Sequence, residues 1–221
     1  MKKYTLLLLL CFSYNFFATA QKNSDIGIFA GASYYLGDIN PGTHFYKAQP
    51  AFGVLFRYNV NPRLSVRANA YYISLSGSDA DFPEILHPDR LYSPAVFKTS
   101  FLDAALQVEF NFLPYTPGIR PFDFTPYLTT GISTGLIMGS DAGAGNFASL
   151  PFGAGIKMTF TKRICGGMEY SFRKTFNDMI DGIENPSGVS SVIHNNDWYS
   201  YIGVFITYKF YNFAADCPAY E

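Results

Sequence analysis

The chain has 221 residues and a formal net charge of -1, and its aromatic content of 18% exceeds its charged content of 15%. Because no basic run extends beyond Lys162-Arg163, the chain lacks the electrostatic footprint of a nucleic-acid-binding protein. The length suits one domain, and many aromatic residues with few charges are typical of a barrel that spans a membrane.

The N-terminal residues have the pattern of a secretion signal. Met1-Lys2-Lys3 is basic, the run from Tyr4 to Phe17 is almost wholly apolar, and Ala18-Thr19-Ala20 supplies the small residues of a cleavage site. An uncleaved anchor is less favoured, because the apolar run is shorter than the roughly twenty residues of a transmembrane helix. The predicted segments are a cleaved signal peptide at 1–20, a barrel at 21–210 and a periplasmic C-terminal tail at 211–221.

Eight later stretches alternate apolar with polar or small residues at period two. This is the pattern of strands, because successive side chains of a strand point to opposite faces. In chain order the stretches are 26–36, 51–60, 64–72, 102–112, 128–136, 152–160, 168–173 and 202–210. The links between them are alternately long and short, as expected of outer loops and periplasmic turns. The sequence therefore predicts an all-β protein, an eight-stranded antiparallel meander barrel in the outer membrane.

A soluble, lipocalin-like barrel is the structural alternative. Alternation alone does not say which row of side chains faces inward, and a soluble barrel would turn the apolar rows inward. Its exterior would normally carry many charges, whereas these strands carry only one or two each. The charge count therefore favours apolar rows that face lipid and charged rows that face the lumen.

An eight-stranded barrel has an interior just wide enough for side chains. Charged residues of the inward rows must share it, either as an ion or proton pathway or as a plug of ion pairs. We favour the plug, because buried charges are tolerated only when they are paired. The predicted network consists of Arg57, Arg67, Asp103, Glu109, Lys157, Glu169, Arg173 and Lys209.

Two cysteines follow the signal peptide. Cys165 comes just after a predicted periplasmic turn, and Cys217 lies in the predicted tail on the same side. Because the periplasm permits disulfides, a Cys165–Cys217 bridge is favoured. A thiol available to a partner and two unlinked thiols remain the alternatives.

Catalytic and metal-binding patterns are weak. The histidines all fall in predicted outer loops, where a lipid hydrolase would need a serine and a carboxylate within hydrogen-bond reach of one of them. The histidines are His44, His87 and His194, and the serines near predicted rims are Ser33, Ser74 and Ser200. No cysteine or histidine pair has metal-ligand spacing. We expect no enzyme, no cofactor, no metal and no small-molecule substrate.

Several motifs occur together in an order that resembles a known family. They are Tyr34-Tyr35-Leu36-Gly37-Asp38, Arg57-Tyr58-Asn59 with Asn61-Pro62, Leu150 to Lys157, Glu169 followed by Arg173-Lys174-Thr175-Phe176 and Asp178, Trp198-Tyr199-Ser200, and Cys217-Pro218. Together they are similar to the PorG-like outer-membrane barrels of Bacteroidota, over nearly the whole mature chain. The resemblance implies a component of the type IX secretion system, associated with a periplasmic ring built from a lipoprotein and its partner. It carries over no catalytic residues.

The expected function is thus a scaffold in protein secretion or gliding machinery, in contact with outer-membrane lipids and the periplasmic ring. The expected contact regions are the turn from Leu113 to Asp123 and the tail, with Phe213, Cys217, Pro218 and Tyr220. An adhesin or surface-defence barrel is the alternative, and it would use the loop segments Arg90 to Val96 and Asn177 to His194. A lipid hydrolase that uses His44 or His194 is the third possibility.

Overall fold

The computed structural model describes residues 24–36, 43–78, 81, 96–116, 122–140, 145–176 and 198–209. The predicted signal peptide and the predicted tail, with Phe213, Cys217, Pro218 and Tyr220, lie outside these residues. The described residues form eight strands: β1 (Ser24–Leu36), β2 (Gln49–Asn61), β3 (Leu64–Ser78), β4 (Val96–Asn111), β5 (Phe124–Ser140), β6 (Asn146–Thr159), β7 (Ile164–Thr175) and β8 (Trp198–Lys209). They include no helix long and apolar enough to cross a membrane.

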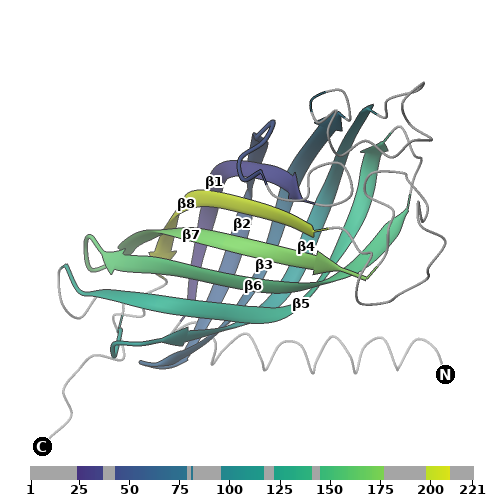
Figure 1. Cartoon of the computed structure of the whole chain (residues 1–221). Coiled ribbons are helices and arrows are strands. Elements are labelled where there is room, and N and C mark those ends of the chain that lie inside the picture. The colour runs from purple at the N-terminus through teal and green to yellow at the C-terminus, as the bar shows by residue number, and fades with distance from the viewer. Residues whose placement is uncertain are drawn as a thin grey trace, which may run out of the picture.

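Each strand pairs antiparallel with the next, and β8 pairs with β1, so the sheet closes into a barrel (Figure 1). Closure leaves no open edge in the sheet, which lipid would not tolerate. Short turns join β2 to β3 and β6 to β7. We call the end with these turns periplasmic and the opposite end outer, as in bacterial barrels. The predicted eight-stranded antiparallel barrel is confirmed.

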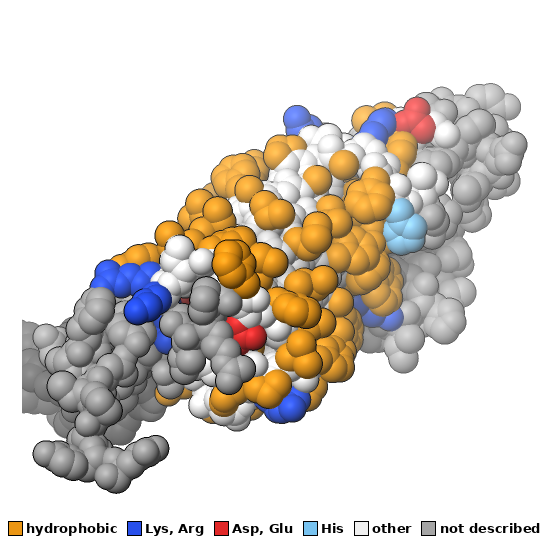
Figure 2. All heavy atoms as spheres, turned by 90° about the vertical axis from the view of Figure 1, so that its left-hand side faces the viewer, with side chains coloured by type: hydrophobic (Ala, Val, Ile, Leu, Met, Phe, Trp, Pro, Cys, Tyr) orange, Lys and Arg blue, Asp and Glu red, His pale blue; other side chains and the backbone are white. Residues whose placement is uncertain are grey.

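The two faces of the wall differ in polarity. On β2, Phe52, Val54 and Phe56 are exposed, whereas Leu55 and Arg57 between and beside them are buried in the lumen. Figure 2 shows apolar side chains over much of the described wall on the face toward the viewer. Because the exposed rows are apolar and the buried rows carry the charges, the polarity is the reverse of a soluble barrel.

Several strands extend further toward the outer end than the sequence predicted. β3 continues from residue 72 to Ser78, and β4 begins at Val96. In this extension the polarity reverses, because Ile73 and Leu75 are buried inside while Ser74 and Ser76 lie on the opposite face. The outward apolar row of β3 therefore ends at Tyr72, and the predicted strand ended there too.

The extension of β3 has an edge without a neighbouring strand, because the pairing of β3 with β2 stops at Ile73. The backbone groups along this edge need other hydrogen-bond partners. Ser33 Oγ donates to the Ser74 carbonyl at 2.7 Å, and the Tyr46 hydroxyl donates to the Ser78 carbonyl at 3.3 Å. Side chains thus take the place of a neighbouring strand along this edge, a common protection against edge-to-edge pairing.

One residue predicted to face lipid is instead covered. Tyr34 lies in the outward row of β1 but is fully buried. Its ring contacts His44 and Phe45, with centroids 5.9 Å and 5.0 Å away. Its hydroxyl hydrogen-bonds His44 Nδ1 at 3.0 Å and also the Tyr170 hydroxyl. The prediction was wrong here because His44 and Phe45 lie against Tyr34 on the outer side of the wall.

Candidate functional site

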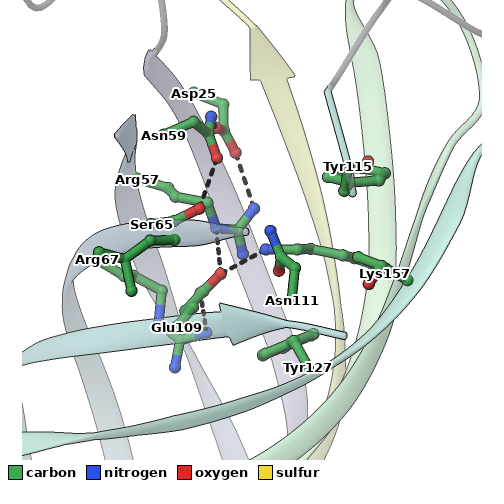
Figure 3. Close-up of polar contacts among 12 residues, drawn as sticks. Asp25, Arg57, Asn59, Ser65, Arg67, Glu109, Asn111, Tyr115, Tyr127 and Lys157 are labelled. Atoms are coloured by element: carbon green, nitrogen blue, oxygen red, sulfur yellow. Dashed lines mark hydrogen bonds and ion pairs between the residues drawn. The ribbon is translucent and has the colours of Figure 1, made fainter. Parts of the chain in front are cut away.

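An ionic cluster occupies the periplasmic half of the lumen, with Glu109 at its centre. Its Oε2 lies 2.9 Å from Arg57 Nε and 2.6 Å from Lys157 Nζ, and its Oε1 lies 3.1 Å from Arg67 Nη1. All four side chains are almost completely buried. Figure 3 shows Arg57 and Lys157 reaching Glu109 from different strands of the wall. One carboxylate therefore contacts three cations.

Two further carboxylates complete the cluster, Glu169 beside Arg67 and Asp25 beside Arg57. Arg67 forms an ion pair with Glu169 and donates from Nη2 to its Oε1 at 2.9 Å. Arg57 Nη1 lies 2.9 Å from Asp25 Oδ2. The sequence reasoning missed Asp25 because the predicted strand began one residue later. The signal was present, since Asp25 continues the odd-numbered inward row of β1.

Two further predicted network residues lie closer to the outer end. Arg173 Nε is 3.0 Å from Asp103 Oδ2, and Arg173 Nη2 donates to the Tyr201 hydroxyl at 2.8 Å. Ion pairs thus join the predicted residues Arg57, Arg67, Asp103, Glu109, Lys157, Glu169 and Arg173, with Asp25 in addition. Lys209 belongs to the same buried lining, in the inward row of β8, where it is opposite Asp25 in the register.

Aromatic side chains fill the lumen beyond the ionic cluster. Phe29 stacks on Tyr71 with centroids 4.6 Å apart, and Tyr71 meets Tyr201 edge-on at 5.6 Å. Further out, Phe101 meets Tyr199 edge-on at 5.1 Å. Edge-to-face contacts of this kind are favourable. The described lumen is therefore packed with side chains, first ionic and then aromatic.

A glycine makes room for this aromatic layer. Gly135 on β5 is opposite Phe147 on β6. A Cβ at Gly135 would lie 2.1 Å from the Phe147 ring, closer than any real contact. The ring can therefore lie against the β5 backbone only because residue 135 has no side chain.

The periplasmic mouth is occupied by Tyr115, which lies in the connection between β4 and β5. This side chain is only 2% exposed. Its N–H donates to the Pro62 carbonyl at 2.9 Å, and its hydroxyl accepts from Thr159 Oγ1 at 3.0 Å. Burial raises the pKa of the Tyr115 hydroxyl well above its ordinary value, so the phenol stays protonated. Within the predicted contact turn from Leu113 to Asp123, the side chain of Tyr115 therefore points into the lumen and not toward a partner.

Other side chains of the same connection point outward. Leu113 is 44% exposed and Phe122 is 75% exposed. Phe122 also has a φ of 61°, a conformation that is strained for a bulky residue. Strain that exposes an aromatic ring is a reason to look for a contact made by that ring.

Cys165 lies inside the lumen near this mouth. It is 3% exposed, and its Sγ is 3.8 Å from Thr159 Oγ1, the hydroxyl that also bonds Tyr115. Among the described residues Cys165 has no disulfide partner. Because Cys217 lies outside them, the Cys165–Cys217 bridge stays a prediction. It requires the tail to enter the mouth beside Tyr115.

Where the structure describes them, the residues considered for hydrolysis are not brought together. The contacts of His44 that the structure gives are with Tyr34, whereas Ser33 Oγ bonds the Ser74 carbonyl. Ser200 is buried in the outward row of β8. His87, His194 and the segment from Asn177 to His194 lie outside the described residues, as does all of Arg90 to Val96 except Val96. The described part of the chain also has no group of three potential metal ligands.

A closed antiparallel sheet of eight strands, apolar on its exposed face and charged within, is the architecture of a transmembrane barrel of the outer-membrane type. The chain is such a barrel, and it lies in the outer membrane as predicted. Residues 2–219 match the family model described as "Domain of unknown function (DUF6089)", so the chain belongs to that family. No curated protein matches the chain.

Solved structures of other barrels are similar in fold. OprG of Pseudomonas aeruginosa has 13% identity and a TM-score of 0.48, over 87% of this chain and 99% of that one. The N-terminal β-barrel domain of OprF from the same species has 15% identity and a TM-score of 0.46, over 84% and 98%. Ail of Yersinia pestis, in complex with the heparin analogue sucrose octasulfate, has 13% identity and a TM-score of 0.45, over 85% and 98%.

Proposed function

We propose that this barrel is a non-enzymatic scaffold of a type IX protein secretion machinery, and that it docks to a periplasmic ring formed by a lipoprotein and its partner. Two things support the proposal. The first is the resemblance of the sequence motifs to PorG-like barrels. The second is the filled lumen, because a barrel without an open interior acts through its rims and its wall.

The observation that carries the proposal is the form of the β4–β5 connection at the periplasmic end. Tyr115 is fixed in the lumen by its hydrogen bonds, so it anchors the connection to the rigid wall. On the same connection Phe122 is held with a positive φ and its ring largely exposed. Exposed aromatic anchors on a fixed backbone are typical centres of protein interfaces.

The test uses two phenylalanines that share a backbone conformation but lie at opposite ends of the barrel. Phe122 is periplasmic, whereas Phe45, with a φ of 62° and 52% exposure, lies at the outer end. A photo-crosslinking phenylalanine analogue is placed at either position in the full chain, and native outer membranes are irradiated. We expect ring proteins in adducts from position 122 and not from position 45.

Folding of both variants is checked by the change in gel mobility on heating that intact barrels show. If position 122 gives no ring adduct in a folded barrel, the proposed docking surface is wrong. If position 45 captures an extracellular protein while position 122 captures nothing, the adhesin or defence alternative replaces the scaffold.

A further inference from the structure

A polar patch lies on the outward face of β3 and β4, just beyond the apolar wall. We define the β3–β4 patch as Tyr72, Ser74, Ser76, Lys98 and Ser100. Lys98 is exposed and is opposite Ser76, while Ser74 and Ser100 face each other with their Oγ atoms 3.1 Å apart. Tyr72 lies in the same outward row of β3 as Ser74 and Ser76. The patch therefore combines one ammonium group with four hydroxyl groups.

The height of the patch follows from the strand itself. The outward row of β4 is apolar from Leu102 to Phe110, and Phe112 continues it just past the strand end. Ten residue steps along a strand tilted by about 40° rise roughly 25 Å, the height of the apolar band of such barrels. Ser100 and Lys98 come next, so they lie at the level of the lipid headgroups.

The aromatic residues agree with this level. The Tyr72 ring stacks on Phe52 with centroids 5.2 Å apart, and such rings mark the membrane interface. The reversal of polarity in β3 begins directly above, where Ile73 turns inward and Ser74 outward. Lipid tails therefore end near Tyr72.

The contacts of its ammonium group distinguish Lys98 from the other lysines described near the outer end. Lys174, in the outward row of β7, has its Nζ 5.2 Å from the Trp198 ring, and Lys47 pairs with Asp81 at 2.6 Å. Within the described ranges, the ion pairs include no carboxylate bound to Lys98. No carboxylate of the described residues therefore competes with an outside anion for this ammonium group.

We propose that the β3–β4 patch binds the phosphate group of a phosphorylated glycolipid of the outer leaflet. The Lys98 ammonium pairs with the phosphate, and the hydroxyls of Ser100 and Tyr72 donate hydrogen bonds to its oxygens, whereas the Ser76 hydroxyl donates to the Lys47 carbonyl. The acyl chains lie along the exposed apolar row below, which includes Leu106. This row favours a lipid over free phosphate, because only a lipid contacts both surfaces.

The test measures binding of lipid A by native mass spectrometry of the full barrel in detergent, with intact and dephosphorylated lipid A. The variants are Lys98→Gln and, as matched control, Lys174→Gln. We expect Lys98→Gln to weaken binding of intact lipid A about fivefold, the effect of one lysine near an anionic membrane surface. Lys174→Gln should bind it like the wild type, and the dephosphorylated lipid should not distinguish the three proteins.

Equal affinity of wild type and Lys98→Gln for intact lipid A would overturn the proposal, as would an equal loss in both variants. Displacement of the lipid by millimolar inorganic phosphate would identify a site for soluble anions and overturn it too. The variant Ser100→Ala, whose change lies on the outer face, should also weaken binding. Its folding is checked by gel mobility before and after heating.

Discussion

Glu109 is the residue on which the ionic cluster depends most. Its two oxygens contact Arg57, Arg67 and Lys157, and none of these groups is exposed to water. A buried charge that loses its partner keeps the cost of its desolvation without the attraction that offset it. Removal of one negative charge here therefore affects three cations at once.

We predict that Glu109→Gln lowers the free energy of unfolding by about 3–5 kcal/mol, the range for breaking a buried pair. The measurement is urea unfolding of the barrel in lipid vesicles. Asp81→Asn is the control, because it removes an exposed pair with Lys47 and exposed pairs contribute little. A Glu109→Gln barrel with the unfolding midpoint of the wild type would show that the cluster does not hold the barrel together.

At the scale of elements, the β4–β5 connection both closes the mouth and presents an exposed ring. Tyr115 contacts Thr159 and lies 5.6 Å from Lys157 Nζ, measured to its ring centroid. The accessibility of Cys165 indicates whether the mouth is closed, because its buried thiol contacts the same Thr159 hydroxyl as Tyr115 does. Opening of the mouth should therefore appear as reactivity of this thiol.

We predict that Tyr115→Ala raises the rate of Cys165 labelling by a water-soluble maleimide by roughly an order of magnitude or more. The experiment is done in a Cys217→Ser background, so that neither a disulfide nor a second thiol interferes. Phe122→Ala, in the same connection but with its side chain outside, should leave the rate unchanged. Fast labelling without the Tyr115 substitution would mean that the mouth is open.

The sequence predicted the strands of the membrane-facing half and most of the ionic cluster, because alternation and charge are local signals. It placed Arg57 and Glu109 on inward rows, where the structure has them. It missed the outer extension of β3, where the alternation has the opposite phase. It also missed Tyr115, because the path of a connection depends on contacts such as the one with Pro62, which no local pattern encodes.

At the scale of the molecule, the single barrel has two sections along its axis, and the polarity of the inner and outer faces is opposite in the two. The membrane-facing part is apolar outside and ionic within, whereas the outer extension has an apolar interior around Phe101 and Tyr199 and polar groups such as Lys98 outside. In each section the exterior suits its surroundings, because apolar side chains face lipid and polar side chains face water. The interior of each section has the opposite polarity. Side chains fill both, so we infer that the barrel acts through its surfaces.

Electrical recording on the full barrel in a planar lipid bilayer tests this central claim most directly. If the described ion pairs and aromatic contacts fill the lumen as the structure indicates, the wild-type barrel should give no stepwise conductance above the bare membrane at either polarity. Stable conductance steps from folded wild-type protein would contradict the account, because they would require a continuous water-filled path past Glu109 and Tyr201.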